Sequence, residues 1–277
     1  LSHIMKKEDY LFSQNIVNDN YKDKAITAYH TTWIGSSSKE LANEINTINK
    51  LKGIKLFKLK IGNDIDIFIK KIQELKSLLP KEILLCTDAN QTMNINSAKK
   101  FVSSADSLDL LWLEEPFAPD NVDAFKKLID YKNANNFKIE IVTGENCPSP
   151  HIAAALMKIG INRFQADPCR MMGFIDIILV SQLGRFFNVP ITPHAGGSCL
   201  DELSLHISFY DQIHNNLDIS KALIENVGFC SHFMKYPSVV SNGKIHAPTE
   251  PGLLVGFDRE VSKKFINYKK GITWLKL

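Results

Sequence analysis

The 277-residue chain has no paired cysteines, no cluster of basic residues and no long apolar run. No run approaches the ~20 apolar residues of a membrane span, and the opening LSHIMKKEDY has no signal-peptide core. The net charge is only +3 and the lysines are scattered, so we expect neither a membrane nor a nucleic-acid partner. No C-x-x-C pair occurs among the dispersed cysteines, which argues against a zinc cluster and favours a reducing compartment: Cys86, Cys147, Cys169, Cys199 and Cys230. We therefore expect an intracellular protein, cytoplasmic or mitochondrial.

Strand-like apolar runs alternate with amphipathic, helix-like stretches from about residue 27 onward. Eight runs have the character of strands: 25–33, 56–62, 83–90, 110–116, 139–145, 163–168, 190–195 and 222–227. The helix candidates between them are 37–51, 65–79, 97–106, 122–131, 149–159, 174–187 and 201–213. Alternation of this kind predicts βα units with parallel strands. Eight such strands favour an α/β protein of the (β/α)8 TIM-like barrel type over an open doubly wound sheet.

The linkers inside this alternating block are short, which predicts one barrel domain over residues 27–236. Residues 1–26 are expected to be a helix remnant followed by a polar linker. Residues 237–277 contain Pro237, Pro248 and Pro251, and we interpret this segment as a C-terminal extension.

Seven consecutive strand candidates end in polar or ionisable residues, and in a barrel of this type those ends meet at one rim. For any one of these residues a capped strand end or a solvated loop is the commoner explanation. All of them together predict an active site. The residues are Lys58 and Lys60, Asp88 and Asn90, Glu114 and Glu115, Glu145, Asp167, His194, and Glu225.

Three carboxylates come from adjacent strands: Asp88, Glu114 and Glu145. Converging carboxylates repel and protonate unless a cation joins them. Oxygen ligands without supporting Cys or His favour a hard ion, Mg²⁺ first and Mn²⁺ second. Glu115, the next residue along the strand from Glu114, is expected to point to the opposite face, where it can pair with a lysine outside the ligand set.

Lys58 and Lys60 are two residues apart on one strand, so their side chains are expected on the same face, with Phe57 and Leu59 facing the helices. Two neighbouring ammonium groups depress each other's pKa, which predicts a lysine base near neutral pH. A solvated Lys-x-Lys edge is the alternative, and it fits an interior barrel strand poorly.

His194 and Asp167 end neighbouring strands, and a carboxylate beside an imidazole makes a general acid or base. A lone histidine is more often a satisfied core residue, but the adjacent Asp167 favours the catalytic interpretation. The AGGS segment after His194 is a weaker candidate for a phosphate-binding loop. Glu225 has two interpretations, a protonated donor to a substrate carboxylate or a cap on the last strand.

The ordered motifs FKLKIG, TDANQ, WLEEP, TGEN, QADPCRMMG and PHAGG resemble the mandelate racemase-like group of the enolase superfamily. PHAGGSCLDELSLH and SHFMKYP are similar to its L-fuconate dehydratase branch, which includes animal mitochondrial proteins. The resemblance implies an enolase-type (β/α)7β barrel. Family members also carry an N-terminal α+β capping domain, and we expect no counterpart of it within these 277 residues. An uncapped barrel mouth would favour self-association, so a homo-oligomer is expected to be possible.

The resemblance implies roles for the site residues. Asp88, Glu114 and Glu145 would hold Mg²⁺. Lys60 would remove the α-proton to give a metal-stabilised enediolate, and His194, supported by Asp167, would help the β-hydroxyl leave. Lys58 and Glu225 would assist catalysis at the substrate carboxylate, and Asn90 is a further candidate for substrate binding.

The implied reaction is dehydration of a sugar acid, with L-fuconate as the leading substrate, to a 2-keto-3-deoxy acid. An epimerase or racemase on the same scaffold, or a truncated non-catalytic barrel, are the alternatives.

Overall fold

A computed structural model describes residues 24–33, 35–62, 64–215, 222–228, 231–247, 256, 258, 267–268 and 272–273. The strands are β1 (Ala25–Thr32), β2 (Leu56–Lys60), β3 (Leu84–Asp88), β4 (Trp112–Glu114), β5 (Glu140–Thr143), β6 (Arg163–Phe164), β7 (Leu223–Glu225), β8 (Val240–Ser241), β9 (Lys244–His246), β10 (Asn267–Tyr268) and β11 (Ile272–Thr273). The helices are α2 (Ser38–Lys52), α3 (Ile65–Leu78), α4 (Ile95–Ala105), α5 (Val122–Ala134), α6 (Pro150–Lys158), α7 (Phe174–Phe187) and α8 (Leu200–Asn215), with 3-10 turns η1 (Asp106–Leu108) and η3 (Ser231–Phe233).

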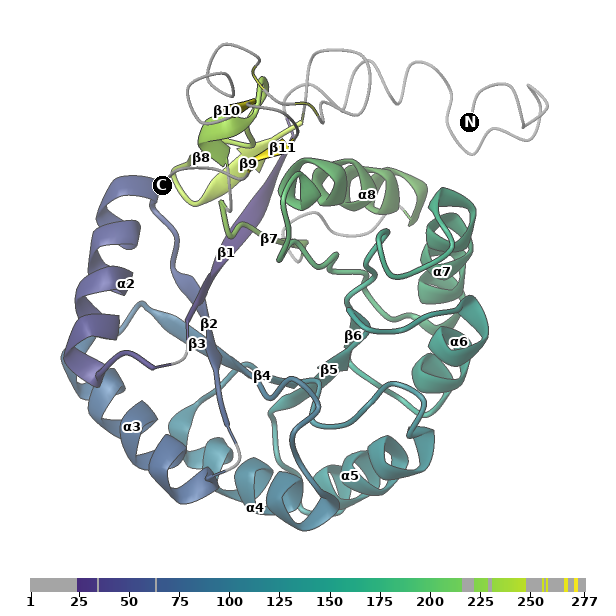
Figure 1. Cartoon of the computed structure of the whole chain (residues 1–277). Helices are drawn as coiled ribbons and strands as arrows, with labels where there is room; N and C mark the ends of the chain where they lie inside the picture. Colours follow the sequence, from purple (N-terminus) through teal and green to yellow (C-terminus); the bar gives the residue numbers. More distant parts are fainter. Residues whose placement is uncertain are drawn as a thin grey trace.

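Parallel strands form a ring that is surrounded by helices (Figure 1). The strand order is β6-β5-β4-β3-β2-β1, and β7 pairs in parallel with the other side of β1. Each of α2 to α7 lies between consecutive segments of this ring in the chain. The predicted α/β barrel is confirmed, and no separate α+β domain occurs among the described residues.

The seventh predicted strand, 190–195, is not a regular strand. It makes one isolated parallel bridge, between Ile191 and Phe164 of β6. The physical reason is that Pro190 and Pro193 have no N–H to donate to a ladder. The segment still follows the path of a strand beside β6, because Thr192 N donates to Phe164 O at 2.9 Å. His194 therefore reaches the rim where the sequence placed it.

Two apolar clusters hold the barrel. The larger lies between the strands and the helices and includes Phe57, Leu59 and Leu113, as the alternation predicts. The smaller one fills the inside of the ring and consists of Tyr29, Leu56, Cys86, Trp112 and Val142. These interior side chains are buried, so they fill the barrel interior. The polar residues lie above them, at the ends of the strands.

The β8–β9 hairpin packs on the barrel. Strand β9 pairs antiparallel with the first half of β1, with Ile26 opposite Ile245. The hairpin turn touches the end of α2 so closely that a Cβ on Gly53, which has a φ of +72°, would lie 2.8 Å from Gly243 N. Part of the predicted extension thus pairs with the first strand.

Residues 1–23 and most of 248–277 lie outside the described residues, so the terminal domain assignments stay predictions there. Within the described part of the chain no helix is both long and apolar enough to cross a membrane.

Candidate active site

The three predicted metal ligands lie together at the ends of β3 to β5. Asp88 and Glu114 are the last residues of β3 and β4 and are paired in register, and Glu145 follows β5 by two residues. One oxygen from each carboxylate lies within 4.8 Å of the others, and all three residues are buried. Burial and the neighbouring Asp88 raise the pKa of Glu114 well above its usual range. Such a group is costly without a cation.

Both lysines of β2 point at these carboxylates. Lys58 is fully buried, with Nζ 2.7 Å from Glu114 Oε1 and 2.9 Å from Glu225 Oε1. Lys60 Nζ lies 2.5 Å from Asp88 Oδ2, and its side chain is 18% exposed. Lys60 is therefore the lysine that a substrate above the carboxylates can reach.

Lys58 lowers the pKa of Lys60, as expected, but the net shift of that pKa is upward. Burial and Lys58 both lower the pKa of Lys60, and the carboxylates of Asp88 and Glu114 together outweigh them. The pKa of Lys58 is likewise raised, because Glu114 and Glu225 outweigh its burial. The sequence showed the two lysines next to each other but not the carboxylates that face them.

The contacts of Glu225 favour its ionised form over a protonated donor, because Lys58, Thr31 and the Ala195 N–H all face its oxygens. Burial opposes its ionisation, but Lys58 and His194 lower its pKa below the usual range. Its second oxygen accepts a hydrogen bond from Ala195 N at 2.9 Å, and Thr31 Oγ1 donates to Oε1. Glu225 thus fixes Lys58 and the segment after His194 at the same time.

The expected lysine partner for Glu115 is also wrong. Glu115 is buried and accepts from Asn146 Nδ2 at 2.8 Å and from Gln91 Nε2 at 3.3 Å. Its φ of +42° ends the strand alternation that the prediction assumed. Burial, with Glu145 close by, raises its pKa to about 7.

His194 and Asp167 form the predicted pair. His194 Nδ1 lies 2.8 Å from Asp167 Oδ2. On the other side of the imidazole, Nε2 lies 3.2 Å from Gly196 N and 3.3 Å from Glu145 Oε2. A neutral imidazole accepts a hydrogen bond from Gly196 N, and a charged imidazole forms an ion pair with Glu145. Burial opposes protonation, but Asp167, Glu225 and Glu145 raise the pKa of His194 to about 9. The imidazole has partners in either state, as a proton-transfer group needs.

Gly196 is packed directly against this imidazole. A Cβ at this position would overlap His194 Nε2. The close approach accounts for this glycine of the AGGS segment without a phosphate ligand.

Asn90 lies at the rim, exposed and with a φ of +41°. Its backbone N–H donates to Asp88 Oδ1 at 2.9 Å and so helps to orient that carboxylate. Sequence reasoning missed Thr31, Asn146 and Arg170, which contact Glu225, Glu145 and Asp167, respectively. Thr31 lies near the end of β1. The sequence predicted site residues at the ends of the other seven strand candidates but not at the end of this one.

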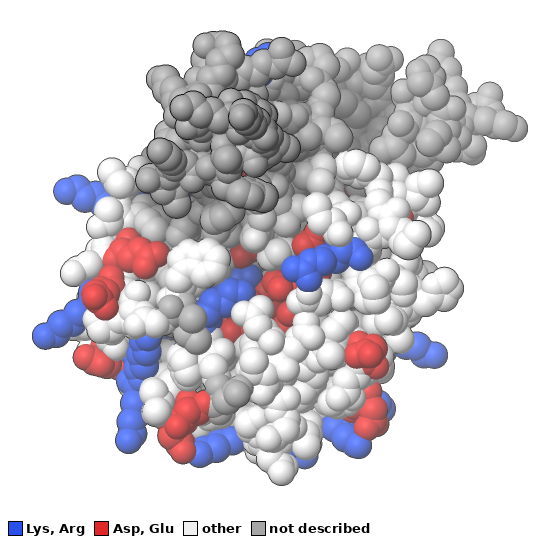
Figure 2. Space-filling model, viewed as in Figure 1, with Lys and Arg blue, Asp and Glu red and all other residues white. Residues whose placement is uncertain are grey.

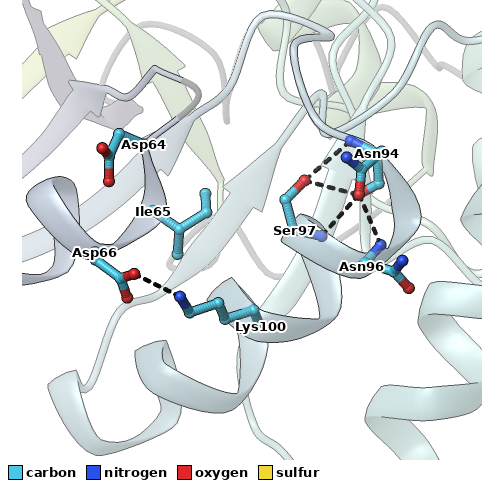
Figure 3. Close-up of a pocket in the computed structure, with 7 residues that line it drawn as sticks. All are labelled: Asp64, Ile65, Asp66, Asn94, Asn96, Ser97 and Lys100. Atoms are coloured by element: carbon cyan, nitrogen blue, oxygen red, sulfur yellow. Dashed lines mark hydrogen bonds and ion pairs between the residues drawn. The ribbon is translucent and has the colours of Figure 1, made fainter.

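Basic and acidic side chains lie side by side at the centre of the ring (Figure 2). Away from these residues, a hollow of about 540 Å³ lies between the starts of α3 and α4 (Figure 3). Lys100 in this hollow is paired, with Nζ 2.6 Å from Asp66 Oδ2, and Asp64 Oδ1 accepts from Ile67 N at 3.1 Å at the start of α3. Asn94 Oδ1 accepts from two backbone N–H groups of α4. The chemistry therefore concentrates inside the barrel mouth.

The fold and the site define an α/β-barrel protein with a carboxylate triad, two lysines and a histidine–aspartate pair at the ends of its strands. The chain matches the family described as Enolase C-terminal domain-like over residues 40–261, and it belongs to that family.

Its relatives include mitochondrial enolase superfamily member 1 of Homo sapiens, 29% identical over 90% of this chain and 56% of that protein. L-galactonate dehydratase of Hypocrea jecorina is 27% identical over 93% of this chain and 58% of that protein. The chain therefore spans a little more than half the length of these relatives.

Solved structures share the fold. The crystal structure of human mitochondrial enolase superfamily member 1 has a TM-score of 0.82 at 27% identity and covers 89% of this chain and 56% of that chain. An enolase from Bradyrhizobium, complexed with magnesium and mandelic acid, has a TM-score of 0.76 at 22% identity, with 90% of this chain and 64% of that chain covered.

Proposed function

We propose that this chain is the catalytic barrel of a divalent-metal-dependent sugar-acid dehydratase. The observation that carries the proposal is the placement of two proton-transfer groups at opposite ends of the carboxylate triad. Lys60 contacts Asp88 at one end, at 2.5 Å. His194 lies 3.3 Å from Glu145 at the other end. A substrate held over the triad would have a base on one side and an acid on the other.

The residues present fit a hard divalent cation. The donors are carboxylate oxygens, which suit Mg²⁺ and next Mn²⁺. Glu145 Oε2 is buried and has no hydrogen-bond partner among the described residues, so a lone pair is left for an ion. With all groups ionised, the site holds two more negative than positive charges: Asp88, Glu114, Glu115, Glu145, Asp167 and Glu225 against Lys58, Lys60, Arg170 and His194.

The reaction would balance as follows. Neutral Lys60 takes the α-proton of a sugar acid, and a double bond forms between the α- and β-carbons. The β-carbon–oxygen bond breaks, and the hydroxyl leaves as water with a proton from His194. The resulting enol becomes a 2-keto-3-deoxy acid. A bound divalent ion would neutralise the charge on Asp88 that keeps Lys60 protonated and would stabilise the negative charge that develops on the substrate carboxylate.

Lys58, Asn90 and Glu225 would complete the substrate site. Lys58 supplies a fixed positive charge, because Glu225 and Glu114 keep it protonated. Asn90 offers an exposed amide at the rim. We propose L-fuconate as the substrate, with L-galactonate as a second candidate because a dehydratase for it is a relative.

A cycloisomerase or epimerase is the second candidate, because two further relatives are cycloisomerases of galactaric and anhydrogalactonic compounds. Each of these reactions would start, like dehydration, with abstraction of the α-proton. Proton NMR in D2O, with Mg²⁺ and either sugar acid, separates them. A 2-keto-3-deoxy product that requires Lys60 supports dehydration. Loss of the α-proton signal with retained hydroxyls supports epimerisation, and no exchange with either substrate contradicts the activity of this chain. Lys60→Ala is the control.

A further inference from the structure

Asn146, directly after Glu145, joins three charged residues of the site through one side-chain amide. Its Nδ2 donates to Glu115 Oε2 at 2.8 Å and to Glu145 Oε1 at 3.1 Å. Its Oδ1 accepts from the Arg170 guanidinium. Its backbone N–H also donates to Glu115 Oε1 at 3.3 Å. The amide nitrogen therefore donates to two carboxylates, and the amide oxygen accepts from the guanidinium of Arg170.

The three charged partners permit only one orientation of this amide. If the group were reversed, its oxygen would face two carboxylates and its NH2 would face the guanidinium of Arg170. An aspartate at this position would add a third carboxylate to Glu115 and Glu145 and repel both. An amide is thus the group that this place requires.

The consequence falls on Glu145. Asn146 holds Oε1 of this carboxylate, whereas Oε2 has no hydrogen-bond partner among the described residues and lies 3.3 Å from His194 Nε2. Arg170 connects Asn146 to the His194–Asp167 pair, because Arg170 Nε lies 3.8 Å from Asp167 Oδ2. Asp167 in turn holds His194 at 2.8 Å. Glu145, Asn146, Arg170, Asp167 and His194 thus form a closed ring of contacts.

We propose that Asn146 is a positioning residue for the divalent cation. Its hydrogen bond to Oε1 orients the Glu145 carboxylate toward the ion, and Arg170 fixes the direction in which the amide faces. The proposal rests on the proposed metal site and adds to it a residue that does not bind the ion itself. Partners that orient ligands in this way typically change metal affinity about 10- to 100-fold when they are removed.

The test is a thermal unfolding series on the purified, EDTA-treated chain at increasing Mg²⁺ concentration. This series needs neither substrate nor turnover. A cation that binds only the folded state raises Tm, and the concentration at half of that rise measures affinity. Asn146→Leu keeps the size of the side chain but makes no hydrogen bond. Asn43→Leu, on the exposed face of α2, is the matched control. We expect Asn146→Leu to raise the midpoint at least ~10-fold and Asn43→Leu to leave it unchanged.

Each outcome decides the matter. A wild-type midpoint in Asn146→Leu overturns the positioning role and leaves the proposed function standing. A wild-type chain whose Tm does not respond to Mg²⁺ overturns the metal site, and this inference with it. If circular dichroism shows Asn146→Leu to be unfolded, Arg170→Gln, at a half-exposed side chain, decides instead: a raised midpoint supports the proposal and an unchanged one overturns it.

Discussion

Glu225 Oε1 lies 2.9 Å from Nζ of Lys58, and both side chains are almost completely shielded from water. The carboxylate comes from β7 and the lysine from β2, so the contact spans β1, which lies between them. A charge pair in such a place is costly to break, because one partner is left buried and alone.

Glu225→Gln should therefore destabilise the protein. The substitution keeps the shape but leaves Lys58 with Glu114 as its near partner, so we expect a loss at the low end of the ~3–5 kcal/mol typical of broken buried pairs. Urea unfolding measures it. Asp123→Asn removes an exposed pair with Lys127 and should cost less than about 1 kcal/mol. Equal losses in the two variants would contradict this account.

Substitutions of Lys60 and of His194 should block different steps of the reaction. Lys60→Met should abolish exchange of the α-proton with D2O, because no base then faces the substrate. His194→Asn should keep the exchange and lose elimination, by roughly 10²- to 10⁴-fold. Proton NMR follows both signals in one sample. Loss of exchange in His194→Asn, with an unchanged Mg²⁺ midpoint, would show that the assignment of base and acid is wrong.

The sequence predicted the positions of these groups better than their charge states. Alternation and the barrel rule place Asp88, Glu114 and Glu145 at one rim, because both depend only on local strand geometry. The pairing of Lys60 with Asp88 depends on which side chains face each other across strands. The left-handed backbone of Glu115 and the pairing of the β8–β9 hairpin with β1 are set by tertiary contacts, which no local pattern reports.

Asp201, near the start of α8, should make stability depend on pH. Its Oδ2 accepts from Gly228 N at 2.8 Å and from Asn226 Nδ2 at 3.0 Å, whereas Oδ1 is buried without a hydrogen-bond partner among the described residues. Burial raises its pKa from 3.8 to about 7. Between these values the folded state holds a proton that the unfolded state releases, so this contribution is full below pH ~4 and is lost as the pH rises through ~7.

Asp201→Asn should remove that dependence. The free energy of unfolding of the wild type, measured in urea from pH 4 to pH 8, should fall relative to the variant by a few kcal/mol. The amide keeps an oxygen for Gly228 N, so the variant should fold. Parallel curves for the two proteins would mean that Asp201 is ionised throughout the range.

Two adjacent glycines should respond differently to alanine. A Cβ on Gly196 would overlap the imidazole of His194, whereas a Cβ on Gly197 would make ordinary contact with Leu200 at 3.5 Å. Gly196→Ala should displace the imidazole from its present position and slow elimination, by ~10²-fold or more for a displaced general acid. Exchange of the α-proton at Lys60 should change little, because Lys60 contacts Asp88 at the other end of the triad. Gly197→Ala should behave as wild type, and an equal loss of elimination in both variants would show that the loop, rather than the imidazole, had been disturbed.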